Sequence, residues 1–311
     1  MLLGDFLREG IARLESLYPA PEARNILLLL CAARLGTSRY TYLTEPGYEI
    51  SAESFKELSE DTDRLASGEP IQYVLGYEEF CGRRFKVCPD VLIPRPETEI
   101  LCAEAIKISK GNSAPVRVLD LCTGSGCIAW TMALDIPGSV VYGVDISPAA
   151  LAIASTQHPL PVPEPVEGPA PVEGPVPVEG PAPVEGPAPV EGPAFLQADI
   201  LQDPPHFPGG KFNLILANPP YIKESQKADM RPNVLNFEPA LALFAPDEDP
   251  LVFYRAVARW SRALLAPGGT GIVEINELLG PETRDIFLES GFGNVRILRD
   301  FSEKNRFVVY S

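Results

Sequence analysis

The chain has 311 residues, a formal net charge of −16, six cysteines and two histidines. This length allows one large domain or two modest ones with a sizeable core. The acidic charge disfavours an extended nucleic-acid duplex as the substrate, because lysine and arginine contacts with phosphate supply most non-specific affinity. Cysteines without a CxxC pair and so few histidines support neither a metal site nor a disulfide framework.

The beginning of the sequence lacks the pattern of a secretion signal. Its longest strongly apolar run, residues 26–33, is far shorter than the ~18 residues that a membrane span requires. We therefore expect a soluble cytoplasmic protein with reduced, mostly buried thiols and no membrane partner.

The N-terminal part has the apolar spacing of a small helical bundle. From Leu3 to Leu17, apolar residues recur at three- and four-residue intervals, which predicts a first helix. A second helix is expected from about Pro21 to Arg34, where Gly36 can end it, and its apolar sequence predicts a central position. Ser51 can cap a third helix, with Gly68 as a left-handed residue after it.

The next stretch changes in character. Phe80, Phe85 and Val87 flank Cys81–Gly82, which predicts a short hairpin, and a proline-framed loop, IPRPE, follows it. We therefore expect a helical domain, a hairpin linker and a larger α/β domain, at residues 1–72, 73–110 and 111–311 respectively.

Short apolar strands then alternate with helical stretches, a pattern typical of a parallel, doubly wound sheet with helices on both faces. The strands are expected at VRVLDL, VVYGVD, AFLQAD, FNLILAN and GTGIVEI. Two further strands, NVRILRDF and RFVVYS, lie too close together for a crossover helix, so the last strand should be antiparallel. The predicted fold class is α/β, with a Rossmann-like sheet of seven strands.

Residues 165–194 are five consecutive hexads of the PVEGPA type. Two prolines in every hexad exclude a helix, and valine and alanine alone cannot form a core there. We interpret residues 161–194 as a disordered insertion in a surface connection, where added length costs little. Binding to a proline-recognition domain is an alternative that composition alone does not favour.

The segment VLDLCTGSG, residues 118–126, is a strand followed by a turn of small residues and a helical stretch. Gly124 and Gly126 let the backbone pass close to a ligand, although such a turn alone is more often explained by close packing. Asp145 ends the next strand, 19 residues after Gly126, where an acidic side chain can hold a ribose diol. Together these features predict a nucleoside cofactor.

The motifs that are missing indicate which nucleoside binds. Neither GxGxxG nor GxxxxGK[ST] occurs, so a dinucleotide and a triphosphate are disfavoured. S-adenosylmethionine has no phosphates and fits a turn without a phosphate cradle or a lysine. Asp199 ends the third strand, where it can face the adenine amine or cap the residues that follow, and the sequence leaves both possibilities open.

Asn218, Pro219, Pro220 and Tyr221 follow the fourth strand, so we expect them at the same sheet edge as the cofactor turn. Pro220 keeps Pro219 extended, so the Pro219 carbonyl and the Asn218 side-chain oxygen become two acceptors for a planar NH2 group. Tyr221 can pack its ring against a flat substrate. Such a site would orient an amide or aromatic amine for methylation without a dedicated base. A mere strand break is the alternative for an isolated Asn-Pro-Pro.

Four stretches of the sequence carry a resemblance to a known family, and they are YVLGYEEFCGRRFKVCPDVLIPRPETEIL (73–101), VLDLCTGSGCIA (118–129), VDISPAALAIA (144–154) and ANPPYI (217–222). In these residues the chain resembles the release-factor glutamine methyltransferases, which modify the glutamine of the GGQ loop in class-one peptide-chain release factors. LIPRPETE is the more specific motif, because Asn-Pro-Pro-Tyr is shared with nucleic-acid amino-methyltransferases. The resemblance implies a helical domain, a hairpin linker and a methyltransferase domain.

The resemblance also implies roles for individual residues. Those expected to hold S-adenosylmethionine are Cys122, Thr123, Gly124, Ser125, Gly126, Asp145, Asp199, Ile200 and Asn218. Those expected to bind the glutamine and carry catalysis are Asn218, Pro219, Pro220 and Tyr221, and Pro94–Glu97 should border the pocket. Cys122 departs from the family, in which glycine is commonest there, and the hexads shorten the helix after Asp145, which puts adenosine affinity in question.

The leading hypothesis is S-adenosylmethionine-dependent N5-methylation of the GGQ glutamine in class-one release factors, with the helical domain contacting this protein substrate and no direct nucleic-acid substrate. The alternatives are a ribosomal-protein glutamine methyltransferase, a nucleic-acid amino-methyltransferase, which the acidic charge opposes, and a binding protein whose cofactor site the insertion has impaired. Methyl transfer to defined substrates separates the enzymes, and cofactor binding tests the last alternative.

Overall fold

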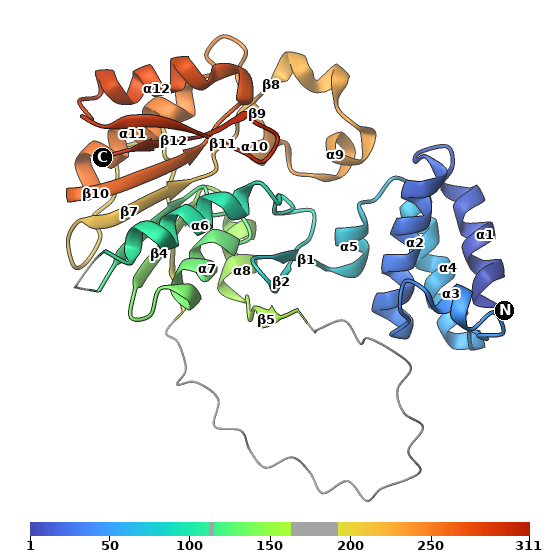
Figure 1. Cartoon of the computed structure of the whole chain (residues 1–311). Coiled ribbons are helices and arrows are strands. Elements are labelled where there is room, and N and C mark those ends of the chain that lie inside the picture. The colour runs from blue at the N-terminus through green and yellow to red at the C-terminus, as the bar shows by residue number, and fades with distance from the viewer. Residues whose placement is uncertain (112–114, 163–191) are drawn as a thin grey trace, which may run out of the picture. The chain divides into compact units, whose positions relative to one another are not determined.

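The protein is described by a computed structural model that covers residues 1–111, 115–162 and 192–311 (Figure 1). The described residues form two compact units, Met1–Leu75 and a second one that runs from Gly76 to Pro161 and continues in the described part of Val190–Ser311. Most of the expected disordered insertion, residues 163–191, lies outside the described residues. The ends expected for it, at 161 and 194, are corrected, because Pro161 and Ala194 each belong to a strand.

The first unit is helical, as the sequence predicts, with α1 at Leu3–Leu14, α2 at Ala20–Leu35, α3 at Thr41–Thr44, α4 at Ala52–Ala66 and α5 at Ile71–Leu75. Helix α4 begins after Ser51, whose side chain accepts a backbone hydrogen bond (3.1 Å), and α2 ends at Gly36 with a left-handed φ of 68°. Both predicted ends are confirmed. Helix α1 ends at Leu14, before the expected Leu17, and a turn follows in which the Leu17 and Tyr18 N–H groups both bond the Leu14 carbonyl at 3.0 Å.

The core of the first unit lies between α1, α2 and α4. Each of these helices contacts the other two, and Leu27 and Leu30 of α2 are fully buried, so the prediction that α2 is the central helix stays a prediction. A Cβ on Gly10 of α1 would come within 2.7 Å of Leu27, so the glycine permits the close approach of the two helices. Leu29 is 56% exposed, so α2 also has an outward face that its apolar sequence does not reveal.

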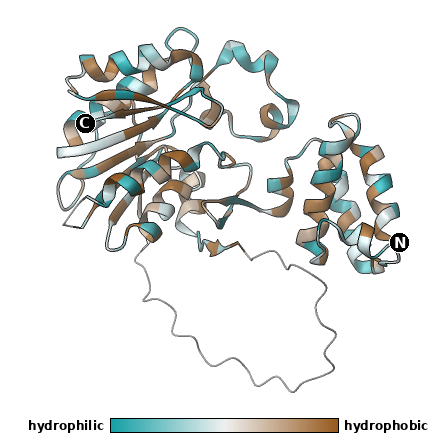
Figure 2. Ribbon diagram, in the orientation of Figure 1, coloured by the Kyte–Doolittle hydropathy of each residue, from teal (hydrophilic) through white to brown (hydrophobic). Residues whose placement is uncertain are grey.

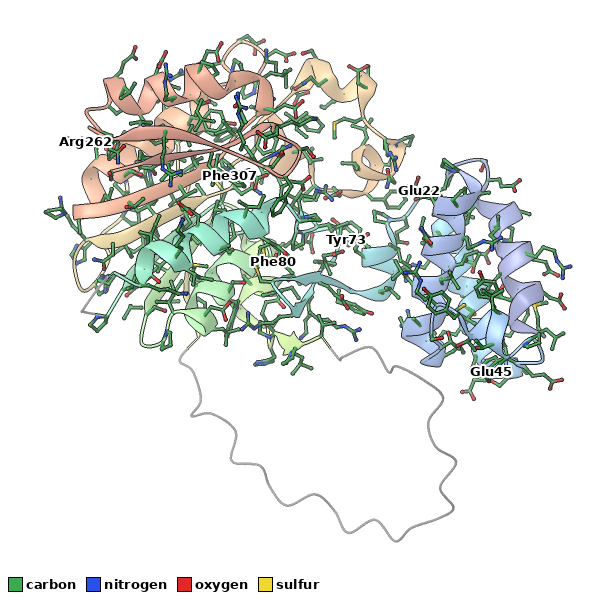
Figure 3. The ribbon with its side chains drawn as sticks, in the orientation of Figure 1. Glu22, Glu45, Tyr73, Phe80, Arg262 and Phe307 are labelled. Atoms are coloured by element: carbon green, nitrogen blue, oxygen red, sulfur yellow. The ribbon has the colours of Figure 1, made fainter. Side chains whose placement is uncertain are left out.

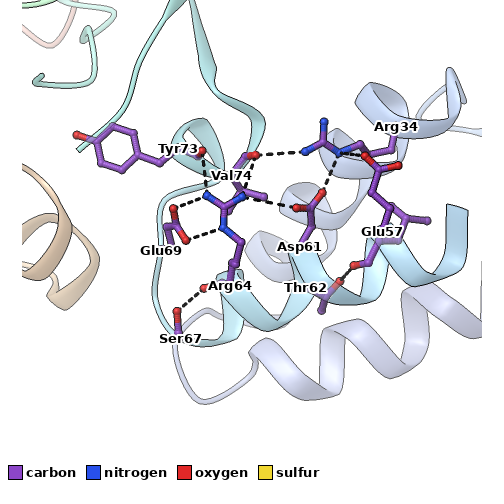
Figure 4. A network of polar contacts seen from close by, with 10 residues as sticks. Arg34, Glu57, Asp61, Thr62, Arg64, Ser67, Glu69, Tyr73 and Val74 are labelled. Carbon is purple, nitrogen blue, oxygen red and sulfur yellow. Dashed lines mark hydrogen bonds and ion pairs between the residues drawn. The ribbon is translucent and has the colours of Figure 1, made fainter. Parts of the chain in front are cut away.

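A network of charged side chains also holds the first unit together (Figure 4). Asp61 is only 6% exposed and accepts from Arg34 Nε at 2.8 Å, with Arg64 at 3.7 Å. Arg64 also pairs with Glu69 (2.6 Å) and donates to the carbonyl of Tyr73 (3.2 Å). The buried carboxylate therefore has two guanidinium partners, which offset the cost of removing its charge from water.

The predicted hairpin is present as strands β1 and β2, at Tyr77–Phe80 and Arg83–Lys86. Cys81 and Gly82 have φ angles of 48° and 70°, the left-handed pair that a tight two-residue turn requires. Phe80 and Phe85 are almost fully buried and meet edge to face at 6.0 Å in the core of the second unit. The hairpin is therefore part of this unit.

The boundary between the two units differs from the expected one. The first unit ends at Leu75 rather than at residue 72. Helix α6, Thr98–Ser109, buries Leu101 and Cys102 in the same core as the hairpin. Residues 73–110 thus do not form a separate linker, because residues 73–75 belong to the helical unit and the apolar side chains after them join the core of the larger unit.

Seven strands form the main sheet in the order β11-β12-β10-β7-β3-β4-β6. Their bounds are β3 Arg117–Leu121, β4 Val140–Asp145, β6 Ala194–Gln197, β7 Phe212–Ala217, β10 Leu265–Glu274, β11 Val295–Arg299 and β12 Asn305–Tyr310. Strands β6, β4, β3, β7 and β10 are parallel, and β12 runs antiparallel to β10 and β11. The predicted Rossmann-like sheet with an antiparallel last strand is confirmed.

The other elements cover or extend this sheet. The helices are α7 Cys127–Asp135, α8 Pro148–Ser155, α9 Pro232–Phe237, α10 Ala240–Leu243, α11 Val252–Leu264 and α12 Gly280–Glu289, with 3-10 turns η1 at Glu224–Asp229 and η2 at Glu277–Leu279. Short strands β5, β8 and β9 lie at Leu160–Pro161, Ile222–Lys223 and Phe244–Ala245. Strand β5 pairs with β2, and β8 pairs with β9. Within the described residues, none of the helices has the length and hydrophobicity to span a membrane.

Successive residues of the central strands point into two cores, one on each face of the sheet. Val118 and Phe307 pack with α6 and α7, whereas their neighbours Leu119 and Val308 pack with α11 and α12. These strands are buried on both faces and read as continuous apolar runs, which Figure 2 shows in its hydrophobic colours. Figure 3 marks Phe80 and Phe307, which belong to the same core.

The register of the sheet brings three chain segments to one edge. Leu121 at the end of β3 is paired with Val144 of β4 and with Ala217 of β7. The residues that follow these strand ends therefore meet at the carboxyl edge, and they are Cys122, Asp145 and Asn218. In open parallel sheets this edge is where ligands bind.

Candidate functional site

The turn between β3 and α7 has three left-handed residues. Cys122, Gly124 and Gly126 have φ angles of 59°, 53° and 80°. This backbone explains why glycine is favoured at such positions, since a Cβ in the left-handed region costs about 1–2 kcal/mol. Cys122 adopts the conformation despite its side chain.

Gly124 and Gly126 of this turn differ in the space around them. A Cβ on Gly124 would meet no atom within 4 Å, so this part of the backbone faces open space. A Cβ on Gly126 would lie 2.9 Å from the Cβ of Ala154 in α8 and 3.2 Å from the ring of Phe195. Gly126 therefore serves the packing of α7 on its neighbours, and Gly124 leaves room for a ligand.

Asp145 ties the turn to the next strand. Its Oδ2 accepts from the Gly124 N–H at 2.8 Å, and its Oδ1 accepts from the Ser147 N–H at 2.9 Å. Burial raises the pKa of the Asp145 carboxyl, and the backbone N–H bonds partly oppose that rise. The carboxylate keeps lone pairs for further donors, because each oxygen can accept more than one hydrogen bond.

A second carboxylate, Asp120, lies beneath the turn and is fully buried. Its Oδ2 accepts from the Thr123 hydroxyl at 2.5 Å, and its Oδ1 has no partner within the described residues. Burial raises the pKa of Asp120 to about 7. The Thr123 side chain thus points back into the protein, and Ser125 is also buried, with its carbonyl accepting from Gln157 at 3.0 Å.

A cavity of about 190 Å³ opens at this edge of the sheet. Its lining comes from the carboxyl ends of β3, β4, β6 and β7, from the loop after the hairpin, from Pro239 and from α8, α10 and α11. The lining residues are Asp90, Val91, Leu92, Cys122, Gly124, Asp145, Ile146, Ser147, Ala150, Ala198, Asp199, Ile200, Leu201, Asn218, Pro220, Pro239, Leu241, Ala242 and Phe253. The cavity therefore belongs wholly to the second unit.

The lining of the cavity suits a nucleoside with a positive charge and without phosphates. Its walls are mostly apolar, with carboxylates at Asp90, Asp145 and Asp199. Carboxylates accept from ribose hydroxyls or an adenine amine and favour a cation such as a sulfonium or an ammonium group. The described lining residues include neither lysine nor arginine, which a phosphate would need. With the open backbone at Gly124, this chemistry fits S-adenosylmethionine.

The Asn-Pro-Pro-Tyr turn borders the same cavity. Asn218 and Pro220 line it, and Asn218 is half-buried. Among the described residues, no hydrogen bond reaches the Asn218 Oδ1 or the Pro219 carbonyl oxygen. Two acceptors are therefore available beside a cavity for a charged nucleoside.

A chain of hydrogen bonds runs from this turn into the protein. Asn218 Nδ2 donates to Thr98 Oγ1 at 3.3 Å, and the Thr98 hydroxyl donates to Glu274 Oε2 at 2.7 Å. The Tyr221 hydroxyl donates to Glu274 Oε1 at 3.1 Å. Asn276 Nδ2 donates to the Tyr221 carbonyl at 3.1 Å, so the turn is held at both ends.

The loop that carries the proline-framed motif is anchored beside the cavity. Arg95 donates to Glu238 Oε1 at 2.6 Å, and the Ile93 N–H donates to Glu238 Oε2 at 3.2 Å. Glu238 is buried and directly precedes Pro239, which lines the cavity. The expected border at Pro94–Glu97 is corrected to Asp90–Leu92, since Pro96 and Glu97 are exposed and Arg95 is engaged by Glu238.

The structure separates the site residues expected from the sequence into two groups. Those that line the cavity are Cys122, Gly124, Asp145, Asp199, Ile200, Asn218 and Pro220. Thr123, Ser125 and Gly126 serve the turn's own packing, and Tyr221 sends its hydroxyl to Glu274. Asp199 also caps the residues after β6, because its Oδ1 accepts from the Leu201 N–H at 2.8 Å.

Sequence reasoning did not single out Thr98, Glu274, Leu241 or Phe253. Thr98 lies 120 residues from Asn218 and 176 from Glu274, so their contacts have no local pattern. Leu241 and Phe253 are ordinary helical apolar residues. The sequence contains one signal for Glu274: it is a charged residue in the apolar predicted strand GTGIVEI, where a buried position usually holds an apolar residue.

Comparison with known proteins decides the family. Residues 5–76 match the model described as the PrmC N-terminal domain, close to the bounds of the helical unit. The release factor glutamine methyltransferase of Bacteroides thetaiotaomicron is 37% identical over 297 residues, which cover 95% of each chain. The protein of the same name from Cereibacter sphaeroides is 32% identical, over 99% of this chain and 98% of its own.

The chain belongs to the release factor glutamine methyltransferase family. It is a methyltransferase, as the sequence predicts, and its cavity fits the predicted cofactor, S-adenosylmethionine. This release factor glutamine methyltransferase family member therefore has a cavity whose lining fits the cofactor of its family.

Proposed function

We propose that this enzyme transfers the methyl group of S-adenosylmethionine to the side-chain amide nitrogen of the GGQ glutamine in class-one peptide-chain release factors. The observation that carries the proposal is that Asn218 and Pro220 line the same cavity as Gly124 and Asp145. An acceptor site for an NH2 group thus adjoins a site for a charged nucleoside. The names of the relatives support the choice of substrate.

The cofactor-binding residues act through shape and charge. Gly124 leaves space for the ligand, and Asp145 offers lone pairs to the ribose hydroxyls. Asp199 and Ile200 line the cavity, where Asp199 would accept from the adenine amine and Ile200 would pack on the adenine ring. S-adenosylmethionine supplies an electrophilic methyl group on its sulfonium when it is bound.

The Asn-Pro-Pro-Tyr turn acts on the substrate nitrogen. Asn218 Oδ1 and the Pro219 carbonyl accept its two hydrogens, which favours positive charge on a nitrogen whose lone pair is otherwise delocalised. The same two bonds orient the nitrogen toward the methyl group. Once methylated, the amide nitrogen would carry a positive charge and would lose one of its two hydrogens as a proton to water, so a dedicated base would be unnecessary. Tyr221 closes the turn and offers its ring to the flat amide.

The helical unit is proposed to help recognise the release factor, because the cavity alone is too small to select a whole protein. Leu29, Tyr40 and Leu43 are 56%, 57% and 63% exposed on this unit, so their apolar side chains are accessible to a protein partner. Tyr40→Ser with Leu43→Ser should raise KM for the release factor several-fold without changing kcat. Leu288→Ser, at a 44% exposed position of α12, is the matched control, and equal KM values for both variants would contradict the proposal.

Methyl transfer tests the proposed function directly. Labelled S-adenosylmethionine is incubated with the intact release factor, its GGQ glutamine mutant, ribosomal proteins and duplex DNA, each with the wild type and Asn218→Ala. Label only on the intact factor, lost with Asn218→Ala, is the expected result. Label on ribosomal protein or DNA would replace the proposed substrate, and cofactor binding without any transfer would indicate a binding protein. Residence in the cytoplasm is part of the proposal, since release factors act there.

A further inference from the structure

One buried acidic side chain, Glu274, lies behind the site rather than in the cavity. It ends β10, is 1% exposed, and accepts hydrogen bonds from the neutral hydroxyls of Thr98 (2.7 Å) and Tyr221 (3.1 Å). Arg306 acts on it through space and is itself paired with Asp300 at 2.9 Å. A buried carboxylate without a bonded cation is costly, so its retention calls for a role beyond packing.

The direction of each hydrogen bond follows from the chemistry of the groups. An ionised carboxylate can only accept, so the Thr98 hydroxyl must donate to Glu274. A hydroxyl has one hydrogen, which leaves Thr98 Oγ1 as an acceptor on its other side. The Asn218 amide must therefore turn its NH2 group toward Thr98, as the 3.3 Å contact from Nδ2 shows. Its oxygen is then free on the opposite side.

We propose that Glu274 and Thr98 are positioning residues that fix the orientation of the Asn218 amide, so that the site presents an oxygen rather than an NH2 group to the substrate nitrogen. This inference rests on the proposed function. Glu274 also receives the Tyr221 hydroxyl, so one carboxylate holds both ends of the Asn-Pro-Pro-Tyr turn. Neither Glu274 nor Thr98 lines the cavity.

A fixed Asn218 amide selects a substrate group that donates hydrogen bonds. A flipped Asn218 amide would set NH2 against the NH2 of the substrate glutamine and lose one of the two acceptors. It would instead suit an acceptor such as the carboxylate of a glutamate. The Asn218 amide alone has little preference between its two orientations, because its oxygen and nitrogen are nearly equal in size. The direction of the hydrogen bonds from Asn218 to Thr98 and from Thr98 to Glu274 supplies that preference.

Thr98→Val and Thr98→Ser form the matched pair that tests the proposal. Valine keeps the shape and removes the hydroxyl, whereas serine keeps the hydroxyl. We expect Thr98→Val to lower kcat on the release factor about tenfold, the effect of one hydrogen bond, and Thr98→Ser to stay within about threefold of the wild type. KM for the release factor and Kd for S-adenosylmethionine should change less than about threefold. Wild-type kcat in Thr98→Val would overturn the inference.

A double mutant separates positioning from a merely structural role. In an Asn218→Ala background no amide remains to be oriented, so adding Thr98→Val should change the residual single-turnover rate by less than about twofold. If Thr98 only supports the fold, the two losses should multiply. Multiplication of the losses would therefore overturn the inference even when Thr98→Val alone is slow.

A substrate-free measurement distinguishes failure of this inference from failure of the proposed function. In protein labelled with 15N-asparagine, the side-chain NH2 signal that disappears in Asn218→Ala is assigned to Asn218. Its hydrogen exchange should be slow in the wild type and in Thr98→Ser, and faster in Thr98→Val. Equal exchange in all three proteins would overturn the inference, whatever substrate is methylated. Slow exchange lost only in Thr98→Val, without methylation of the release factor, would uphold the orientation and reject the proposed substrate.

Discussion

Two buried carboxylates, one in each unit, are held in opposite ways. Asp61 in the helical unit is 6% exposed and contacts two guanidinium groups, at 2.8 and 3.7 Å (Figure 4). Glu274 in the sheet unit is 1% exposed and is bonded to two hydroxyl groups. Burial raises the pKa of Glu274, and the hydroxyl bonds and the field of Arg306 only partly oppose the rise.

This difference separates a charge that holds the fold from a charge that serves a site. Removing Asp61 leaves Arg34 and Arg64 without a shared partner, so the helical unit depends on it. Glu274 and the still more isolated Asp120 weaken the sheet unit when they are ionised. Perturbed carboxylates of this kind gather at functional sites, and both lie at the carboxyl ends of strands of the sheet, Asp120 in β3 and Glu274 in β10.

The largest expected effect concerns Asp120. Its pKa is raised from 3.8 to about 7 in the folded state, which corresponds to about 4 kcal/mol. The folded protein binds this proton more tightly than the unfolded chain, so the stabilisation is present below about pH 4 and is lost as pH rises through about 7. Asp120→Asn should therefore unfold at higher urea than the wild type at pH 8, and the difference should nearly vanish at pH 4.

Tryptophan fluorescence is the appropriate probe for this comparison, because both tryptophans, Trp130 and Trp260, lie in the sheet unit. Asp61→Asn serves as the control in the other unit. Equal pH dependence of the unfolding midpoint in the wild type and Asp120→Asn would show that Asp120 is not the group that titrates.

The next largest effect is expected from breaking the paired carboxylate. Asp61→Asn should destabilise the helical unit by about 3 kcal/mol, since it leaves two guanidinium groups without their shared anion. Hydrogen exchange of amides in α2 and α4 measures this loss. The kcat on the release factor should stay unchanged at temperatures where the unit is folded, and a loss of kcat there would contradict the division of roles.

Gly124 and Gly126 show the same difference between a residue that serves the site and a residue that stabilises the fold. Gly126→Ala places a Cβ 2.9 Å from Ala154 and should destabilise the sheet unit by about 2 kcal/mol. Gly124→Ala meets no atom, so it should cost only the strain of its left-handed φ and mainly weaken S-adenosylmethionine binding. Calorimetric titration and thermal unfolding of both variants give the two readouts. A reversed pattern would show that the glycine facing the ligand was misassigned.

The smallest effect is expected from neutralising Glu274. In Glu274→Gln the new NH2 group can donate to Thr98 and reverse the order of protons, so kcat should fall about tenfold, or about 1.4 kcal/mol. The unfolding free energy should stay equal or rise, because a buried charge is removed. Steady-state kinetics and urea unfolding measure the two quantities. A variant that loses stability while keeping kcat would make Glu274 a structural residue like Asp61.

Local patterns sufficed for much of the fold. The helix ends at Gly36 and Ser51, the hairpin at Cys81–Gly82 and the strands before Cys122 and Asp145 were all predicted, because caps, tight turns and apolar strands depend on neighbouring residues. The boundary near residue 72 and the separate linker were wrong. Local signals mark a change of element, but they do not tell which core an aromatic ring such as Phe80 joins.

The sequence by itself thus determined the order of the elements and the glycine turn after β3, and it predicted the four residues that we propose as the substrate site. Tertiary structure decided which of two neighbouring glycines lines the cavity and which carboxylate has no cation bonded to it. It also brought Thr98, Asn218 and Glu274 together across separations of 120 and 176 residues. Caps, turns and strands depend on neighbouring residues and can therefore be predicted from the sequence. The burial of a side chain and the direction of its hydrogen bonds depend on residues distant in the sequence, which only the folded sheet brings into contact.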